Sequence, residues 1–459
     1  MKSLDTFIAL NRFGLGAAPG ETDAVDADPR GWIKSQIQLD QSVPAAFAKF
    51  PSSSDTLTKI HTARLESLTA LRTTTGGLYR DVFMEGMMAR AQHMIGTNQP
   101  FAERMVLFWS NHFTVSRTKR IIGPAIPAYE REAIRPHIFG KFADMLKAVS
   151  AHPCMISYLD NMASAGPNSA AGRGRIRRTG NKNTLNENLA REILELHTLG
   201  VNGGYTQQDV IELAKAISGW SHGGMRFKRS RAPIDQQPVQ GGFEFRRGFH
   251  EPGPKTVLGK TYEENGVDEG LVILDDLARH PATAKFIATK LVRHFVNDTP
   301  PAGAVEKIAG IFRDTDGDLA DVSAALINLD EVWAEPLPKV KSHYELVIAA
   351  NRAVGNVAAG RGDVLFPLRE LGQLPFSASS PKGWGDKAKD WIAPEALMRR
   401  IEWLRRFSRK VKTTTYPQQI LDDTIGSVAG DETRTWVDRA PSGDAAIAMV
   451  LASPEFQRR

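Results

Sequence analysis

The chain has 459 residues, of which 42% are hydrophobic and 24% are charged. These proportions are typical of a soluble globular protein and exclude a wholly disordered or membrane-embedded chain. Because 58 basic residues stand against 52 acidic ones, the net charge of +6 is small for this length, and a nucleic-acid partner is not indicated. At roughly 150 residues per domain, the length allows about three domains, or fewer if the helices share one core.

The first residues carry only a short apolar patch, 7–10, before Asn11 and Arg12. A secretory signal peptide needs a longer apolar core, so we expect a cytoplasmic protein. No run of about 18 apolar residues occurs, and we therefore expect no membrane-spanning helix.

Helical periodicity dominates the first third of the chain. Apolar residues recur at three- and four-residue spacing in the segments 31–39, 56–72, 78–95, 102–113, 128–134 and 139–149. The segment 163–183 is rich in Gly, Ser, Asn and Arg and is predicted to be a loop. Helices are then predicted at 185–199 and 207–219, the second with Thr206 as its N-cap.

The segment 221–262 changes character. Residues 243–249 (FEFRRGF) and 255–259 (KTVLG) flank a turn at 251–254, which predicts a β-hairpin inserted between helical halves. Helical periodicity returns at 267–279, 282–296, 305–313, 319–327, 343–354, 397–407, 417–425 and 443–451, with a loop-rich section around 366–391.

These patterns predict a mainly α fold, a large multi-helix domain with one inserted β-hairpin around residues 243–259. We divide the chain into an N-terminal helical half, 1–220, a β-hairpin insertion, 221–262, and a C-terminal helical half, 263–459. The second half is expected to pack on the first, as one continuous domain.

The predicted helix 185–199 has a dense polar side. At about 100° per residue, five side chains fall within one arc of about 140°, with His197 on the opposite side. They are Glu187, Asn188, Arg191, Glu192 and Glu195. One interpretation is an exposed ladder of ion pairs at i, i+4 spacing. The other is an inward-facing site in which Glu187, Glu192 and Glu195 bind a divalent metal.

Other candidate residues lie outside this helix. Asn111 and His112 are polar residues in the otherwise apolar segment 103–113, and we assign them to substrate binding. His250 lies at the predicted hairpin turn, where it could ligate a metal or exchange a proton, although a turn histidine is often only solvated. Arg175 and Arg177 belong to a basic stretch before the polar helix and could bind an anion.

Several motifs together carry a family resemblance. They are NRFGLGA at 11–17, ERMVLFWSNHF at 103–113, HPCMISYLDN at 152–161, NENLAREILELHTLGVNGGYTQQDV at 186–210, HEPGPKTVLG at 250–259, LARHPATAKFIATKLVRHFV at 277–296 and SPKGWGDKAKDW at 380–391. The chain resembles the bacterial domain of unknown function 1800 family over nearly its whole length. The resemblance implies a mostly helical bacterial protein, often found beside a sulfatase-like partner with a twin-arginine export signal. Co-export with such a partner would place it in the periplasm.

From these residues we predict a metal- or anion-dependent, hydrolase-like enzyme. Glu192 and Glu195 would be metal ligands or general base, His250 an acid or ligand, and Arg191 the group that steadies developing charge. Asn188 would join the substrate-binding residues, and the cofactor would be a divalent metal ion. The alternative is a non-enzymatic binding or escort protein for the sulfatase-like partner.

Overall fold

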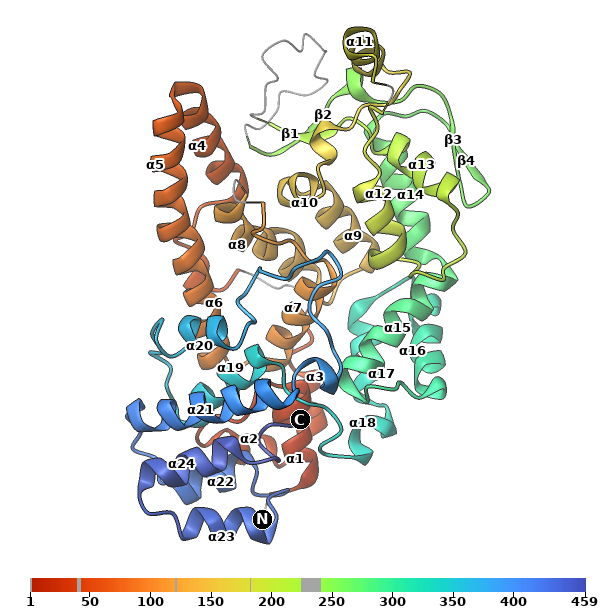
Figure 1. Ribbon diagram of the computed structural model, residues 1–459. Helices are drawn as coiled ribbons and strands as arrows, with labels where there is room; N and C mark the ends of the chain where they lie inside the picture. The colour runs from red at the N-terminus through yellow and green to blue at the C-terminus, as the bar shows by residue number, and fades with distance from the viewer. Residues whose placement is uncertain (1, 39–42, 120–121, 182, 224–240) are drawn as a thin grey trace.

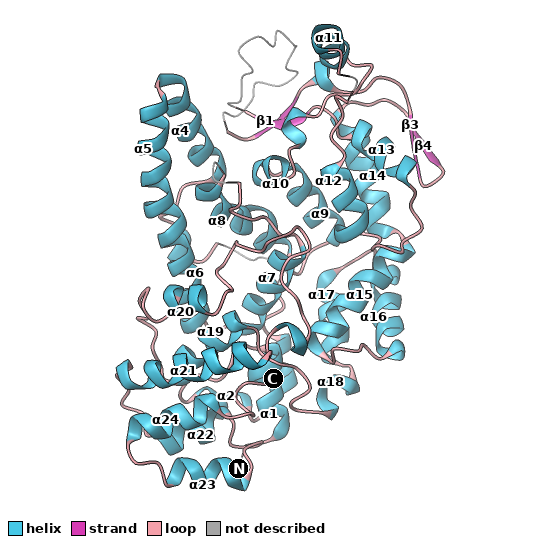
Figure 2. Cartoon of the chain, in the orientation of Figure 1, coloured by secondary structure: helices cyan, strands magenta, loops and turns pink. Residues whose placement is uncertain are grey.

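The computed structural model describes residues 2–38, 43–119, 122–181, 183–223 and 241–459. Helices form nearly all of the regular structure in these residues, as Figure 2 shows. The prediction of a mainly α fold with a small β insertion is confirmed.

The helices of the first half lead up to the two strand pairs (Figure 1). They are α1 (Leu4–Ile8), α2 (Glu21–Val25), α3 (Pro29–Lys34), α4 (Ser53–Glu66), α5 (Leu68–Leu78), α6 (Glu85–Gly96), α7 (Pro100–His112), α8 (Ile126–Tyr129), α9 (Phe142–Ala151), α10 (Pro153–Tyr158), α11 (Ala170–Thr179), α12 (Asn188–Glu192) and α13 (Gln207–Ala216). Four π-helical turns extend this set: η1 (Ala9–Phe13), η3 (Tyr79–Met84), η5 (Glu130–Ile134) and η8 (Ile193–His197).

The helices of the second half follow the strands. They are α14 (Val267–Arg279), α15 (Pro281–Phe295), α16 (Ala302–Asp314), α17 (Leu319–Ile327), α18 (Asp330–Ala334), α19 (His343–Ala353), α20 (Leu365–Glu370), α21 (Pro394–Lys410), α22 (Pro417–Thr424), α23 (Asp431–Asp438) and α24 (Gly443–Ala452). Between α20 and α21 the chain is mostly loop, interrupted by the short 3-10 helix η10 (Ala388–Asp390), as predicted for this section.

The strands in the described residues form two antiparallel pairs, β1 (Trp220–His222) with β2 (Phe243–Phe245), and β3 (Lys255–Val257) with β4 (Lys260–Tyr262). The predicted pairing of 243–249 with 255–259 is therefore wrong. Leu258 and Gly259 both have positive φ, 50° and 78°, which makes a tight two-residue turn between β3 and β4. The part of the predicted insertion at 224–240 lies outside the described residues.

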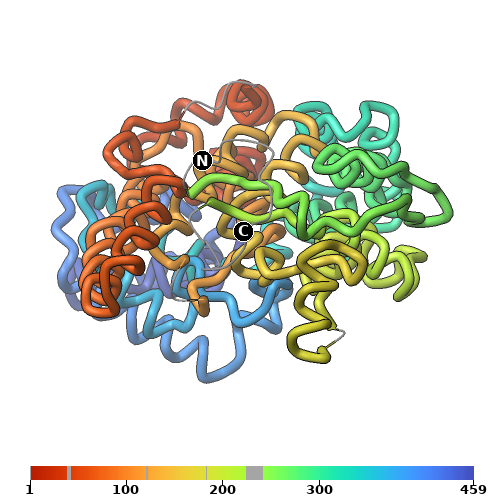
Figure 3. Tube along the Cα trace, turned by 90° about the horizontal axis from the view of Figure 1, so that it is seen from above, coloured from red at the N-terminus to blue at the C-terminus, as the bar shows by residue number. Residues whose placement is uncertain are grey.

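One hydrophobic core runs through both halves. Phe13 of η1 stacks on Phe295 of α15 at 5.3 Å between ring centroids and on Trp333 of α18 at 5.6 Å. In Figure 1 the blue helices α22 and α24 lie beside the red helices α1 and α2, where Thr22 donates to Asp423, and Figure 3 gives the chain as seen from above. Residues from distant parts of the sequence therefore share the same interior.

Helix α15 shows how the periodic pattern fixes a helix face. Its buried positions recur every four residues in two adjacent rows, Thr283, Ile287, Leu291 and Phe295 in one row and Ala284, Ala288 and Val292 in the other. This stripe packs into the core, in contact with α16. The remaining face of α15 is left to line a pocket.

The predicted loop 163–183 contains a helix, α11, and the loop prediction is wrong there. Ser169 caps its N-terminus by accepting a hydrogen bond from the N–H of Gly172, and Gly180 ends it with a φ of 70°. The Gly and Arg content of this segment led to the loop prediction, although Ser169 and Gly180 are residues that commonly cap a helix.

The predicted helix 185–199 is shorter and has two geometries. Its α-helical part is α12, and it continues as the π turn η8. The next helix, α13, begins as predicted, with Thr206 and Asp209 forming a capping box. None of the helices in the described residues is both long enough and apolar enough to cross a membrane.

A buried ion pair ties α7 to the segment after η5. Glu103 is 2% exposed, and its Oε2 accepts a hydrogen bond of 2.9 Å from Nη2 of Arg135. His93 Nε2 lies 3.0 Å from the other carboxylate oxygen. Burial alone would raise the pKa of Glu103, but the charge and hydrogen bonds of Arg135, with His93, lower it to about 2.

We expect Glu103→Gln to lower the free energy of unfolding by about 3–5 kcal/mol, because it leaves the buried Arg135 guanidinium without a counter-charge. The matched control is Glu395→Gln, which removes the solvent-exposed pair with Arg399 and should cost less than about 1 kcal/mol. Equilibrium urea unfolding measures both. Equal losses in the two variants would contradict the assignment of Glu103 as a buried charge partner.

Candidate functional site

A pocket of about 540 Å³ lies where α7, η8, α15, α19 and the loop between α20 and α21 meet. Helix α7 contributes His112 and its neighbours, and α15 contributes the face opposite its buried stripe. Aromatic and charged side chains share the walls. A concave site with apolar walls and a few converging polar groups is the usual form of a small-molecule site.

Lys290 lies against His112 in this pocket. The Lys290 Nζ is 2.7 Å from His112 Nδ1, and His112 Nε2 is 3.1 Å from the backbone oxygen of His197. A carbonyl oxygen can only accept, so Nε2 of His112 carries the proton and Nδ1 accepts from Lys290. Burial of the ammonium lowers the pKa of Lys290 to about 8; the charge of Asp386 opposes this shift, and that of Arg293 adds to it.

His294 and Asp386 form a second pair in the pocket wall. His294 Nδ1 is 3.3 Å from Asp386 Oδ1, while His294 Nε2 is buried and has no hydrogen-bond partner among the described residues. Because a carboxylate accepts, Nδ1 carries the proton of the neutral ring and Nε2 keeps a free lone pair. Burial, together with the charge of Arg459, lowers the pKa of His294 to about 4.

Asp386 is fixed by more than the imidazole. Lys339 Nζ donates to the Asp386 backbone oxygen at 2.6 Å and lies 3.8 Å from Oδ1. Burial would raise the pKa of Asp386, but the charges of His294 and Lys339 outweigh it and lower that pKa below its usual value. Asp386 is therefore an ionised carboxylate that orients His294.

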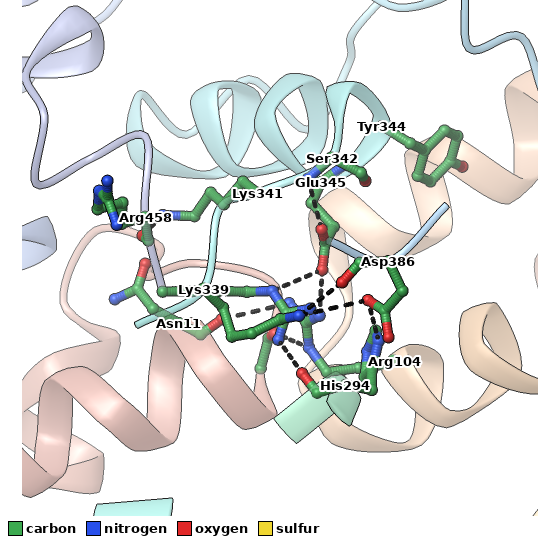
Figure 4. A network of polar contacts seen from close by, with 12 residues as sticks. Asn11, Arg104, His294, Lys339, Lys341, Ser342, Tyr344, Glu345, Asp386 and Arg458 are labelled. Carbon is green, nitrogen blue, oxygen red and sulfur yellow. Dashed lines mark hydrogen bonds and ion pairs between the residues drawn. The ribbon is translucent and has the colours of Figure 1, made fainter. Parts of the chain in front are cut away.

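The neighbouring polar network contains charges that cancel (Figure 4). Glu345 accepts from Arg104 and lies 3.0 Å from Arg459 Nε, and Arg104 Nε also donates to the backbone oxygen of Gly14 at 2.6 Å. Burial alone would raise the pKa of Glu345, but Arg459 and Arg104 hold it well below its usual range. Glu345 therefore compensates the charge of both guanidinium groups.

Other cations of the pocket are not compensated in this way. Lys290, Arg293, Lys382, Lys387 and Lys389 line it, and none of them forms an ion pair within the described parts of the chain. Four carboxylates also line the pocket, Glu195, Glu345, Asp386 and Asp390, against seven Lys and Arg side chains, so the lining keeps a net positive charge. The pocket is therefore electropositive and suited to an anion.

Three of the predicted site residues lie in this pocket: Asn111, His112 and Glu195. Asn111 holds the loop in place, since its Oδ1 accepts from the Trp384 N–H at 2.7 Å and its Nδ2 donates to the Trp384 oxygen at 3.1 Å. Glu195 accepts a long hydrogen bond of 3.4 Å from the hydroxyl of Tyr205.

The rest of the polar arc does not line the pocket. Arg191 Nη2 is 3.0 Å from Glu187 Oε2, and the two side chains are 39% and 34% exposed. This is one of the two pairs of the predicted ladder, and it is worth little in free energy; the described residues show no pair between Arg191 and Glu195. Asn188 is exposed, and Glu192 is half-buried, with a pKa raised by burial and by the charge of Glu195.

The π turn η8 explains why the arc separates. A π turn closes its hydrogen bonds over one more residue than an α turn, so the 100° projection does not hold after Glu192. Glu195 and the adjacent Leu196 both reach the pocket, whereas Glu187 and Glu192 do not.

His250 lies in a separate buried cluster. Its Nδ1 is 3.0 Å from the backbone oxygen of Ser218, and its Nε2 is 3.0 Å from Oε2 of Glu269, which also pairs with Lys255 at 3.0 Å. This cluster joins the residues before β3 to α14. His250 is thus not a solvated turn residue, and it does not line the pocket.

The two predicted arginines lie on α11. Arg175 donates to the backbone oxygens of Thr184 and Ala163, at 3.4 and 3.2 Å, and so braces the chain on either side of α11. Arg177 is exposed. Neither lines the pocket.

The predicted metal ligands Glu187, Glu192 and Glu195 do not gather into a ligand set. Within the described residues no three side chains of His, Cys, Asp or Glu come together in a way that could hold a metal ion. Glu187 instead shares its Oε2 between Arg191 and the amide of Gln207, at 3.0 and 2.7 Å.

Sequence reasoning missed Lys290, Arg293, His294 and Asp386 as site residues. A signal existed in α15, where Phe286, Lys290 and His294 recur every four residues on the side away from the buried stripe. The Gly- and Lys-rich loop at 380–391 was a second signal. Nothing local in the sequence indicates that these two segments meet.

A family model described as "Protein of unknown function (DUF1800)" matches residues 8–458. No curated protein and no solved structure gives a significant match to the chain.

We expect Gly383→Ala to loosen the pocket loop. Gly383 has a φ of 80°, and a Cβ there would lie 2.5 Å from the Asn111 backbone oxygen, so the loop would have to move away from α7. Trypsin should then cleave after Lys382, Lys387 or Lys389 several-fold faster than in the wild type. Gly362→Ala, whose Cβ would meet nothing within 4 Å, is the control; equal rates in the two variants would contradict the close packing.

Proposed function

Because the chain belongs to the family of proteins of unknown function designated DUF1800, we propose its function from its own pocket. It is an enzyme that binds an anionic small molecule and hydrolyses it, with His294 as general base. This proposal keeps the anion-dependent, hydrolase-like prediction and moves the chemistry from the polar arc to α15 and the loop at 380–391.

One observation carries the proposal. The Nε2 of His294 is buried without a partner in the described chain, beside a pocket with uncompensated cations, while Nδ1 is held by Asp386. An imidazole oriented by a carboxylate, with its second nitrogen free, is the arrangement that takes a proton from water or a hydroxyl.

In this proposal some pocket residues bind the anion and another takes the proton. Lys290, Arg293 and Lys382 hold the anionic group, and the ammonium of Lys290 stabilises charge that develops as the bond breaks. A water molecule gives its proton to His294 Nε2 and attacks. The negative charge of the bound substrate raises the pKa of His294 from about 4 toward neutrality, which strengthens the base where it is needed.

The predicted residues keep narrower roles. His112 orients Lys290, Asn111 fixes the loop that carries Lys382 and Asp386, and Glu195 stands at the pocket wall. No step is routed through a divalent metal, because the carboxylates that were predicted to bind one are not assembled for it. Arg191 and His250 take no part in the proposed reaction.

We expect His294→Gln to lower hydrolysis by about 10²- to 10⁴-fold, without changing the affinity for sulfate more than twofold. A panel of p-nitrophenyl phosphate, p-nitrophenyl sulfate and carboxylate-bearing p-nitrophenyl esters measures turnover, and calorimetry measures sulfate binding. Undiminished turnover in His294→Gln would remove His294 from the mechanism.

Sulfate affinity should fall as pH rises through about 8, where Lys290 loses its proton. The charged form exists below that pH, so affinity should be nearly constant from pH 6 to 7 and drop about tenfold between pH 7 and 9. Lys290→Arg should bind with little dependence on pH over this range, and Lys290→Met should bind about 10- to 100-fold more weakly at pH 7. Lys285→Met, at an exposed position of the same helix, should match the wild type.

The alternative from the sequence, a binding or escort protein for a sulfatase-like partner, has one supporting observation. Helix α11 exposes Arg173, Arg177 and Arg178, and no ion pair of theirs occurs within the described residues. Such a basic surface suits an acidic partner. This alternative would be favoured over the enzyme if no substrate of the panel were turned over and if Lys290→Met bound sulfate with the same affinity as the wild type.

A further inference from the structure

Lys290, which is partly buried, differs from the fully buried lysines Lys255, Lys339 and Lys341 in what it contacts. Lys341 donates to the backbone oxygens of Phe456 and Arg458, at 2.7 and 2.6 Å. Lys255 donates to a backbone oxygen at 2.6 Å and to Glu269 at 3.0 Å. Lys339 is likewise held by carboxylates and a carbonyl. Each of these ammonium groups has oxygen acceptors that stabilise its charge.

Lys290 has no oxygen acceptor within hydrogen-bond distance in the described residues. Its contacts there are the imidazole nitrogen of His112 at 2.7 Å and the face of Phe286 at 5.6 Å. An ammonium group has three N–H bonds and needs acceptors for them, whereas a neutral amine needs fewer. The surroundings of Lys290 therefore favour the amine more than those of Lys255, Lys339 or Lys341 do.

His112 also orients this amine. Since Nε2 of His112 donates to the His197 carbonyl, its Nδ1 is an acceptor and takes one N–H of Lys290. The lone pair of a neutral Lys290 is left free for chemistry in the pocket. An amine desolvated beside other cations is the usual form of a nucleophilic lysine, and Arg293 and Lys382 lie close enough for their charges to lower its pKa.

We infer that Lys290 is an amine nucleophile that forms an imine with an aldehyde or ketone carrying an anionic group. Arg293 and Lys382 hold the anion, so the carbonyl carbon lies next to Nζ. This activity uses the pocket of the proposed function but does not require that the protein be a hydrolase.

The step balances without any further reactant. The lone pair of Lys290 Nζ attacks the carbonyl carbon, the C=O π electrons move to oxygen, and a proton passes from nitrogen to that oxygen to give a carbinolamine. The second N–H proton of the carbinolamine nitrogen then passes to the hydroxyl group through His294 Nε2, and the hydroxyl group leaves as water as the C=N bond forms. Addition of water reverses the reaction.

The test uses glyoxylate, an anionic aldehyde, with sodium cyanoborohydride, which reduces the imine to a stable carboxymethyl-lysine. We expect peptide mass spectrometry at pH 8 to find Lys290 modified at least about tenfold faster than Lys285, because its pKa of about 8 gives far more free amine than an ordinary lysine. Sulfate should slow the labelling of Lys290 and not that of Lys285. Propanal, which has no charge, keeps the free-amine advantage and lacks the anion contact, so it should favour Lys290 over Lys285 less strongly than glyoxylate does, and sulfate should not slow its labelling.

Equal labelling of Lys290 and Lys285 by glyoxylate would overturn the inference, and equal preference for propanal would overturn its anionic part. These measurements use the wild-type protein alone, so a folding defect in a variant cannot affect the result. Failure here is distinct from failure of the hydrolase proposal: unlabelled Lys290 with His294-dependent turnover leaves the hydrolase standing, and labelled Lys290 without turnover leaves the amine chemistry standing.

Discussion

The carboxylate of Glu345 is the interaction on which the centre of the molecule depends. It compensates two buried guanidinium groups, Arg104 from α7 and Arg459 from the far end of the sequence. Arg104 in turn holds the backbone oxygens of Gly14 and Asn11, so one charge organises segments from both ends of the chain. Two arginines left uncompensated at this depth would cost several kcal/mol. Arg104 and Glu345 also line the pocket, and Figure 4 shows them close to His294 and Asp386.

The ion-paired carboxylates of this network differ from Lys290 and His294, which lie in the pocket. Glu103 and Glu345 are each paired with arginine, whose charge lowers the pKa of the carboxyl. Lys290 and His294 lie nearby with lowered pKa values, and the Nε2 of His294 has no hydrogen-bond partner in the described chain. In the function we propose, the paired carboxylates stabilise the fold, and Lys290 and His294 carry the chemistry.

The sequence predicts those features that depend on neighbours within a few residues. The stripe of α15 and the capping box of Thr206 follow from local spacing and were predictable. Helix α11 was missed because its Gly content concealed its capping residues, Ser169 and Gly180. The π turn η8 was missed because a 100° projection assumes a uniform helix, so Glu192 and Glu195 were placed together on one arc when only Glu195 reaches the pocket. His112 was identified as a polar residue needing a partner, but that its partner is Lys290, 178 positions away, is a property of tertiary packing alone.

The bond between Asn111 and Trp384 joins residues 273 positions apart, and this separation has a consequence during synthesis. At roughly 5–20 residues per second, about 15–55 s pass on the ribosome between the two. Lys290 and His294 are made in the last third of that interval, and α15 can then fold before Asp386 and the loop that encloses it exist. A ligand of this pocket can therefore stabilise the chain only after the loop at 380–391 has been made and has packed on α7 and α15.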